Sequence, residues 1–390
     1  MNRFATVFQD FEDVHFYKDV GCVPALYSRL KFGRTSIIVY RRRKVPLTVP
    51  AELADDLMLV GLEAGSTAEF YAKALKYLWT NKEVKIVNLY HLKLAHLLFF
   101  EILKLIRPDV TRYLKLDMDQ RVIENVTARP HGLRAFKLKT WLFIAKRLDV
   151  ISAETSNVFE HLRSYEPALQ RNVFFLPNGI WAENTASVSR VEAREKIILC
   201  VGRIGAEQKN NELALNAFCE LERLDGWRLV FAGPVEPHFQ KLIDELFRKR
   251  PELASAIELT GPLDKAHVYD LYAKASVFCL TSRWEGFPLV LPEAAYFGNY
   301  ILTTDIGGAR EVTENGRLGT IVRDASVRGF RNAFQAIIDG DIDIEGMSAR
   351  QQAFCASRMT WEYLIPILQR RIQLHVNGEC GSFDQHAAGS

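Results

Sequence analysis

Two glutamates, Glu285 and Glu293, have seven residues between them in the largely apolar stretch SRWEGFPLVLPEAAYFGNY. A buried carboxylate is costly unless a partner pairs with it, so both need an explanation. Carboxylates at such positions can accept hydrogen bonds from the hydroxyls of a sugar or a ribose. The alternative for Glu293 is an acid in the first turn of a helix, where it suits the helix dipole.

Two cations lie in a second stretch, IILCVGRIGAEQKNNELAL, with Arg203 just after a predicted strand and Lys209 shortly before a predicted helix. An arginine can hold phosphate oxygens bidentately, and a lysine adds a point charge. They could equally be ordinary surface cations. In TTDIGGAREV, Gly307 and Gly308 follow another predicted strand, where either a close backbone approach to a ligand or a simple turn explains both.

The elements that must position these residues form a regular pattern. Short β-branched or aromatic runs alternate with helical patterns: SIIVYR, VKIVNLY, VTRYLKLD, DVISA and VFFLP in the first half, and IILCVG, WRLVFAG, AIELTG, ASVFCLTS and YILTTD in the second. Nearly continuous apolar strands separated by helices indicate parallel sheets covered on both faces. We therefore predict an α/β protein with two doubly wound, Rossmann-like domains that face each other across a cleft.

Ligands bind at the carboxyl ends of the strands in such sheets. The pattern places Glu285 on the loop after ASVFCLTS, and Glu293 at the start of the next helix, with Pro292 at its favoured first position. The start of that helix offers unpaired N–H groups that suit an anion such as a diphosphate. Both glutamates are therefore expected to overlook the cleft.

The length of 390 residues exceeds what one hydrophobic core usually supports. We expect a domain over 1–185, a second over 186–358, a helix over 359–376 that packs back toward the first domain with a kink at Pro366, and a disordered tail over 377–390. Residues 1–183 contain 27 basic against 20 acidic residues, and the remainder contains 23 against 27. The first domain is therefore the better match for an anionic partner, although the net charge of ordinary solvated surfaces also varies by this amount.

Several classes of protein are not expected. The six cysteines form no C-x-x-C pair and are interpreted as core residues of a reducing compartment. The N-terminus carries acids where a signal peptide needs apolar residues, and AHLLFFEILKLI, broken by Glu101 and Lys104, is too short to span a bilayer. We expect a cytoplasmic protein with at most a peripheral contact at the inner face of the membrane. No motif indicates nucleic-acid binding.

The second half resembles the family 4 retaining glycosyltransferases of the GT-B fold. The resemblance rests on CVGRIGAEQKN, FAG, ELTGPL, YAKASVFCLTSRWEGFPLVLPEAAYFGNYILTTDIGGAREV and NGRLGTIV, in the family's order and spacing, and more loosely on SAETS and FLPNG in the first half. It implies a nucleotide-diphosphate sugar donor whose diphosphate is neutralised by Arg203 and Lys209. Glu285 would then hold hydroxyls of the donor sugar, and Glu293 those of the ribose.

The resemblance implies further donor contacts. Backbone of Gly286, Phe287, Pro288 and Leu289 would pack around sugar and phosphate, and backbone from Gly261 to Leu263 would face the base. In KDVGCVPAL, Gly21 precedes a predicted helix and matches the family's first loop against the donor phosphates. No metal or other cofactor is expected. Transfer would proceed with retention, with a phosphate oxygen accepting the proton of the acceptor.

One position departs from the family. Where many members carry a histidine at the end of a strand in the first domain, this chain has Asp117, in YLKLDMDQ. Asp117 either orients an acceptor hydroxyl or stabilises charge at the anomeric carbon, or it is a structural turn acid. With Asp119 it forms an Asp-x-Asp pattern, which holds a divalent cation in a different glycosyltransferase fold. His91 and His131 are further candidates for the cleft.

The first domain is expected to bind a glycan or lipid-linked glycan acceptor, in the synthesis of a bacterial surface polysaccharide. Its basic segments, ARPHGLRAFKLKTWLFIAKRLD and RRRK at 41–44, either face an anionic membrane or are ordinary solvated surface. A hexose-type sugar on UDP is favoured as donor, with GDP and dTDP open. The alternatives are a sugar-nucleotide epimerase of similar fold and a catalytically silent sugar-nucleotide binder.

Overall fold

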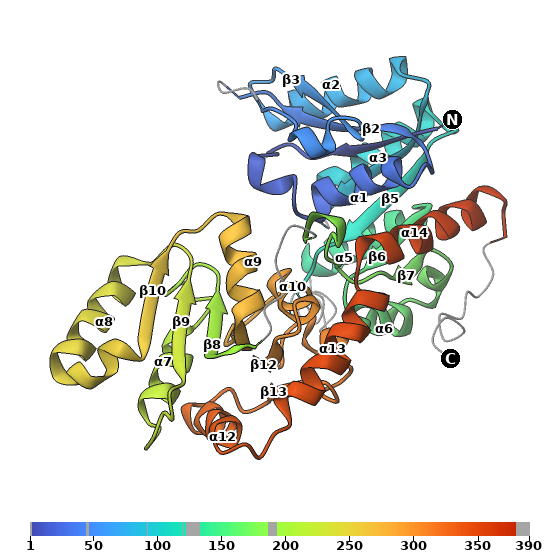
Figure 1. The fold of residues 1–390 in the computed structure, drawn as a ribbon. Coiled ribbons are helices and arrows are strands. Elements are labelled where there is room, and N and C mark those ends of the chain that lie inside the picture. The colour runs from blue at the N-terminus through green and yellow to red at the C-terminus, as the bar shows by residue number, and fades with distance from the viewer. Residues whose placement is uncertain are drawn as a thin grey trace. The chain divides into compact units, whose positions relative to one another are not determined.

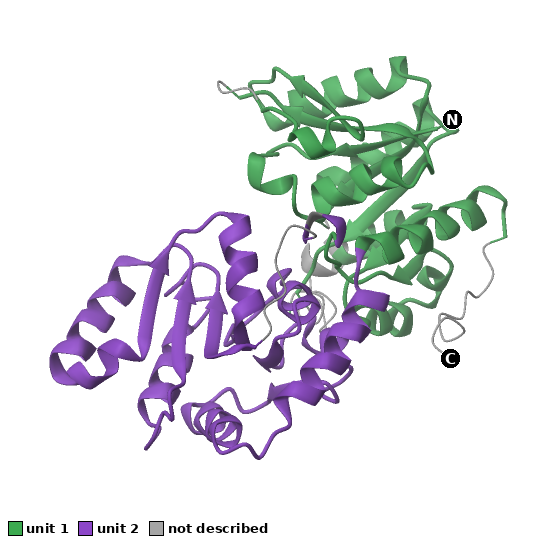
Figure 2. Ribbon diagram, in the orientation of Figure 1, with its two compact units in different colours: residues 1–181, 361–390 green, residues 182–360 purple. Residues whose placement is uncertain are grey.

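The computed structural model describes residues 2–43, 47–91, 93–119, 121, 133–185 and 193–379. Contacts divide the chain into two compact units, residues 1–181 with 361–390 and residues 182–360 (Figure 2). The divisions lie a few residues from the expected 185 and 358. The expected tail over 377–390 falls mostly outside the described residues.

The first unit is built on a seven-stranded sheet with all neighbouring strands parallel, in the order β3-β2-β1-β4-β5-β6-β7 (Figure 1). Its strands are β1 (Arg3–Val7), β2 (Arg34–Arg41), β3 (Leu57–Leu62), β4 (Val84–Tyr90), β5 (Thr111–Leu116), β6 (Val150–Ala153) and β7 (Val173–Phe175). Its helices are α1 (Asp19–Arg29), α2 (Thr67–Thr80), α3 (Leu94–Ile106), α5 (Leu133–Ala145), α6 (Ser156–Tyr165) and α14 (Trp361–Val376), with short 3₁₀ turns at Asp13–His15, Ala51–Leu53 and Pro167–Arg171.

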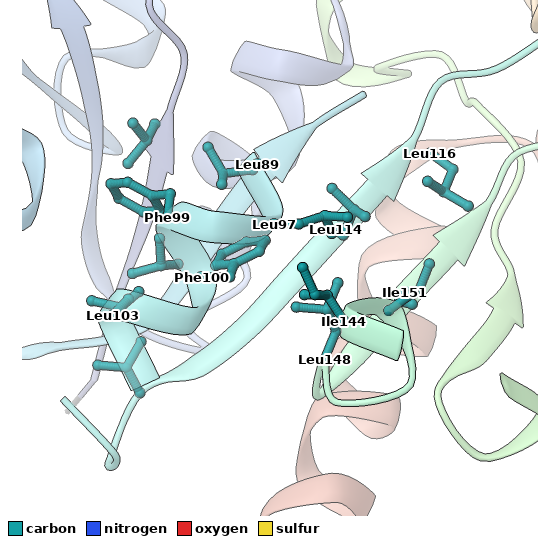
Figure 3. Packing of buried hydrophobic residues seen from close by; sticks show 14 of the residues in the cluster. Leu89, Leu97, Phe99, Phe100, Leu103, Leu114, Leu116, Ile144, Leu148 and Ile151 are labelled. Carbon is teal, nitrogen blue, oxygen red and sulfur yellow. The ribbon is translucent and has the colours of Figure 1, made fainter. Parts of the chain in front are cut away.

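Both faces of this sheet are buried, as the continuous apolar strands predict. One face packs against α2, α3, α5 and α6, and Figure 3 shows Leu97, Phe100 and Leu103 of α3 among the side chains of this cluster. The other face packs against α1 and α14, with Trp361 and Leu364 fully or nearly fully buried. The last helix of the chain therefore completes the core of the first unit.

The second unit repeats the design on a six-stranded parallel sheet in the order β10-β9-β8-β11-β12-β13. Its strands are β8 (Glu195–Val201), β9 (Arg228–Ala232), β10 (Ile257–Gly261), β11 (Ala275–Leu280), β12 (Tyr300–Thr304) and β13 (Gly319–Val322). Its helices are α7 (Asn211–Cys219), α8 (Pro237–Lys249), α9 (Lys265–Lys274), α10 (Val290–Tyr296), α11 (Ala309–Val312), α12 (Val327–Ile338) and α13 (Ile344–Arg358), with 3₁₀ turns at Glu183–Thr185 and Pro251–Ser255.

Helices cover both faces of the second sheet as well. Helices α7, α8 and α12 bury one face, and α9, α10, α11 and α13 bury the other. The sheet order reverses between β8 and β11, because the chain first adds strands on one side of β8 and then on the other. Loops after these two strands therefore meet at a switch point, which is where ligands bind in doubly wound sheets.

Some elements differ from the sequence predictions. Strands β1, β3 and β13 were not among the predicted strands, although each pairs in a sheet. Pro292 is the third residue of α10 instead of the first. Pro366 lies inside α14, and the kink expected there stays a prediction. Helix α10 starts earlier because Leu289 and Val290 already adopt helical backbone, with Glu293 N donating to Leu289 O over 3.2 Å.

Candidate active site

Glu285 lies on the loop after β11, as predicted, and its carboxylate is held by three donors. Lys209 Nζ donates to Oε1 over 2.7 Å, and Ser282 Oγ donates to the same oxygen over 2.8 Å. Gln208 Nε2 donates to Oε2 over 3.0 Å. The Glu285 side chain is 10% exposed and that of Lys209 is 16% exposed. The loops after β8 and β11 are therefore joined through one oriented, nearly buried carboxylate.

Arg203 lies on the same loop as Lys209 but has a different environment. It is exposed, and its Nη2 donates to Gln208 Oε1 over 3.4 Å. Beside it is a hollow of about 460 Å³, whose lining includes Arg203, Glu207, Gln208, Glu236, His238 and Trp284. A guanidinium at the edge of an open, polar hollow can reach an anionic ligand without breaking a strong ion pair.

Glu293 is the fourth residue of α10 and is 6% exposed. Lys265, the first residue of α9, forms an ion pair with its Oε1, and the Tyr272 hydroxyl donates to its Oε2 over 3.4 Å. Burial, together with the charge of Glu293, raises the pKa of Tyr272 well above its usual value, so this hydroxyl stays a donor. The Glu293 carboxylate is thus fixed by α9 as well as by its own helix.

The predicted base-facing residues precede that same helix. Gly261 ends β10 with φ +71°, and Leu263 lies between it and α9. A Cβ on Gly261 would meet no atom within 4 Å, so its backbone borders open space. Lys265 therefore links the loop that contains Gly261 and Leu263 to the Glu293 carboxylate.

The segment from Gly286 to Leu289 packs closely against the loop after β12. A Cβ on Gly307 would lie 1.8 Å from Gly286 O and 2.7 Å from Glu285 O. Only glycine fits there, because the backbones of the two loops touch. Gly308 has φ +82°, and its Cβ would meet the buried Phe287 ring at 3.1 Å. Close packing of one loop on another therefore explains Gly307, and this is neither the ligand contact nor the simple turn considered from the sequence.

Pro288 and Leu289 lead into α10. Leu291 N donates to Pro288 O over 3.1 Å, so the turn of the loop continues directly into the helix. The loop that contains Glu285 therefore leads directly into the helix that contains Glu293.

Comparison with known proteins gives a family match within the second unit. Residues 195–339, which contain both glutamates, Arg203, Lys209 and Gly307, match the sequence profile of the family described as "Glycosyl transferases group 1". Over these residues the chain is similar to the group 1 glycosyltransferases. This agrees with the resemblance to the family 4 enzymes that the sequence showed.

Curated relatives of the chain are named as glycosyltransferases. A phosphatidyl-myo-inositol mannosyltransferase of Mycobacterium tuberculosis is 24% identical over 212 residues, 52% of this chain and 54% of that protein. A Campylobacter jejuni GalNAc-alpha-(1->4)-GalNAc-alpha-(1->3)-diNAcBac-PP-undecaprenol alpha-1,4-N-acetyl-D-galactosaminyltransferase is 26% identical over 49% of this chain and 52% of that protein. The chain spans about half the length of the curated relatives it matches.

Solved structures match over nearly the whole chain. A sucrose-phosphate synthase from Thermosynechococcus elongatus has a TM-score of 0.71 at 15% identity, covering 97% of this chain and 100% of that one. Anabaena HepE in complex with UDP and glucose has a TM-score of 0.67 at 13% identity, with the same coverage of both chains. The fold of the chain is therefore GT-B, as predicted.

In the first unit, Asp117 directly follows β5 and is half-exposed. Its Oδ2 lies 3.6 Å from Nδ1 of His91, which follows the neighbouring strand β4 and has φ +61°. Asp119 Oδ2 instead pairs with Arg121 Nη2 at 2.6 Å. The two acids of the Asp-x-Asp pattern thus have different partners, and His131 lies outside the described residues.

Gly21 is not ahead of a helix, as the sequence analysis expected. It is the third residue of α1 and is buried. A Cβ there would lie 2.5 Å from Phe16 O and 2.6 Å from His15 O, so the helix packs tightly on the turn before it. This packing is sufficient to explain the glycine.

A buried charged cluster at the same edge of the first sheet was not predicted. Lys115 of β5 is fully buried and pairs with Glu154, which follows β6, and with Asp19 Oδ2 at 3.1 Å. Lys115 Nζ also donates to Asn178 Oδ1 over 2.8 Å. Burial raises the pKa of Glu154, and the nearby carboxylates of Asp117 and Asp19 act in the same direction against the charge of Lys115.

The partners of the two glutamates were also missed. Gln208, Ser282, Lys265 and Tyr272 each donate to a glutamate, but only the position of Ser282, three residues before Glu285, could have indicated a local hydrogen bond. The others come from distant segments, and only the tertiary fold brings them to the carboxylates.

Proposed function

We propose that the chain is a retaining glycosyltransferase that transfers a hexose-type sugar from a nucleotide-diphosphate sugar, with UDP favoured, to a hydroxyl of a glycan or lipid-linked glycan. The observation that carries the proposal is the Glu285 carboxylate, held between the cation-bearing loop after β8 and the loop after β11. This is the switch point of the second sheet, where a diphosphate ligand is expected.

Each residue would have a separate task in donor binding. Arg203 and Lys209 would neutralise the diphosphate, whose negative charge grows as the glycosidic bond breaks. Lys209 has three N–H donors, so it can bind a phosphate oxygen while one N–H stays on Glu285. Glu285 would accept from hydroxyls of the sugar, and Glu293 from those of the ribose.

The remaining donor contacts would come from backbone. The Gly286–Leu289 segment would border sugar and phosphate, and the loop from Gly261 to Leu263 would face the base. The Trp284 ring and the acids Glu207 and Glu236 line the hollow beside Arg203, and such a mixture suits a sugar with one apolar face and several hydroxyls.

We propose that the reaction needs no metal, because the cations named above would balance the leaving diphosphate. A phosphate oxygen would take the proton of the attacking hydroxyl, which leads to retention at the anomeric carbon. Asp117, with His91 beside it, would orient the acceptor hydroxyl. The alternative role of Asp117 as a structural turn acid predicts no effect of its removal on kcat.

Support for the donor and acceptor classes comes from relatives. Anabaena HepE is known in complex with UDP and glucose. The Campylobacter relative is named for an undecaprenol-linked glycan, and a relative from Erwinia amylovora is an amylovoran biosynthesis glycosyltransferase. We accordingly propose a role in the synthesis of a surface polysaccharide in the cytoplasm.

The proposal is tested by calorimetric titration of the full chain with UDP, GDP and dTDP, each with and without EDTA. We expect one nucleotide to bind tightly and equally well in EDTA. Binding that disappears in EDTA would refute metal independence, and no binding of any nucleotide would refute the donor site. The anomeric configuration of the product, read by NMR, tests retention, and product formation without acceptor would instead indicate an epimerase.

A further inference from the structure

Helix α3 of the first unit exposes a continuous apolar face. Among the described residues, five of the twelve large hydrophobic side chains that are exposed lie on this helix of 13 residues: Leu94, Leu98, Ile102, Leu105 and Ile106. Their spacing of three and four residues puts them on one side of the helix. Leu105 is 84% exposed, so this face lacks the cover that the opposite face, with Leu97 and Phe100, receives from the sheet (Figure 3).

The apolar face continues onto the neighbouring helix α5, which contacts α3. Phe143 of α5 is 62% exposed, and the Arg147 guanidinium lies 5.5 Å from the centre of its ring. Arg147 Nε also pairs with Glu101 Oε2 of α3 at 3.1 Å, and Glu101 lies between Leu98 and Ile102 in the sequence. The ion pair therefore connects Phe143 to the α3 face.

The charged side chains around this face leave an excess of positive charge. Exposed cations include Lys93 before α3 and Lys139 on α5. The acids close to it are held in ion pairs, Glu101 with Arg112 and Arg147, and Asp109 with Arg107 and Lys85. Apolar side chains bordered by cations complement the acyl chains and the anionic head groups of a lipid surface.

We propose that the face formed by Leu94, Leu98, Ile102, Leu105, Ile106 and Phe143 docks the protein onto a bilayer that contains anionic phospholipids. Among the described residues no helix has both the length and the apolar character to cross a membrane, so the contact lies at the surface of the bilayer. The leucines and isoleucines enter the boundary between head groups and acyl chains, while Lys93 and Lys139 extend to the phosphates. The basic aromatic segment expected from the sequence takes part through α5, but α3 supplies most of the apolar contact. Docking does not depend on the donor chemistry proposed above.

The test is co-sedimentation of the full chain with vesicles of phosphatidylcholine, with and without phosphatidylglycerol. We expect binding to the anionic vesicles that weakens with salt. The variant Leu98→Gln with Leu105→Gln should lower the partition coefficient at least about tenfold, because two leucines no longer enter the lipid. A matched control replaces two exposed apolar residues elsewhere, Leu242→Gln with Val376→Gln, and should bind like the parent protein.

A second variant, Lys93→Gln with Lys139→Gln, should weaken binding to anionic vesicles more than to phosphatidylcholine alone. The substituted side chains are exposed, so we expect the variants to keep the fold, and circular dichroism checks this. Equal binding by the parent protein and the leucine variant would overturn the proposal, as would a parent protein with no preference for anionic vesicles. The proposal would also be overturned if the parent protein does not bind vesicles but forms a dimer in light scattering, and the leucine variant is a monomer. This result would assign the apolar face to contact with a second copy of the chain. Nucleotide titration of the same variants separates this outcome from a failure of the donor site.

Discussion

Lys209 Nζ and Glu285 Oε1 lie 2.7 Å apart, and the two residues come from loops that follow different strands, β8 and β11. The ion pair places one positive and one negative group side by side at the switch point of the second sheet. A ligand that carries both a diphosphate and sugar hydroxyls can use each member of the pair. The ammonium attracts the phosphate, and the carboxylate accepts from hydroxyls.

We predict that Glu285→Gln lowers kcat about 10²–10³-fold, because the amide cannot stabilise charge that develops in the transition state as a carboxylate does. The amide would also turn an N–H toward Lys209 or lose one of its three present donors. Steady-state kinetics with the nucleotide sugar identified by calorimetry measures the effect. Glu222→Gln, at an exposed acid of the same unit, serves as the control and should leave kcat unchanged. An unchanged kcat in Glu285→Gln would remove this residue from the site.

Lys209→Met should act mainly on the donor, raising its KM about tenfold or more through the loss of one charge-assisted contact. The double variant with Glu285→Gln should cost less than the sum of the two single changes, since the residues act as a pair. Full additivity in this cycle would show that the ion pair has no part in donor binding.

Glu293 offers a test of the predicted ribose contact. We predict that Glu293→Gln weakens nucleoside diphosphate binding about tenfold, which corresponds to one hydrogen bond to a charged group. In calorimetry, the 2′-deoxy or 3′-deoxy nucleotide should bind the parent protein more weakly than the ribonucleotide, and the Glu293→Gln variant should discriminate less. Lys265→Met is the matched control, because it breaks the ion pair of Glu293 but leaves the carboxylate. If both variants discriminate like the parent protein, Glu293 has only a structural role.

The sequence was sufficient to predict the two parallel sheets. Their central strands are continuous apolar runs, which are typical of strands buried on both faces of a parallel sheet. It also placed Glu285 correctly on the loop before α10 and Glu293 in the first turns of that helix. It missed β1, β3 and β13, and β13 is a strand of only four residues, Gly319–Val322, that contains a glycine.

The sequence did not indicate which side chains from distant segments pair with each other. Lys265 reaches Glu293 from 28 positions away, and Lys115 reaches Glu154 from 39. Such contacts depend on which strands become neighbours and on side-chain directions, which periodicity does not specify. The sequence also did not indicate why Gly21 is a glycine. Its close neighbour Phe16 O belongs to the turn before α1, and the path of that turn could not be predicted.

Gly307 gives a prediction about how the donor loop is positioned. In Gly307→Ala the new Cβ would start 1.8 Å from Gly286 O, so the loop that contains Glu285 must shift. We expect kcat/KM to fall at least about tenfold and the free energy of unfolding to fall by about 1–3 kcal/mol, as for other overpacked sites. Gly340→Ala is the control, since that glycine has φ +78° but no neighbour within 4 Å. Its alanine should cost about 1–2 kcal/mol of stability through backbone strain without lowering kcat/KM.

The buried carboxyl of Glu154 predicts a pH dependence of stability. Burial raises its pKa, and the carboxylates of Asp117 and Asp19 oppose the effect of Lys115. Because the pKa is higher in the folded than in the unfolded state, the folded protein binds this proton more tightly. The resulting stability is fully present below the pKa of the unfolded state, about 4.3, and is lost as the pH rises through the raised pKa of the folded state.

We therefore expect the free energy of unfolding, measured by urea titration, to fall between about pH 5 and about pH 8 more steeply in the parent protein than in Glu154→Gln. Glu160→Gln, at an exposed acid of α6, should keep the parent slope. A Glu154→Gln variant with the same slope as the parent protein would show that Glu154 is ionised throughout this range and that Lys115 outweighs the burial.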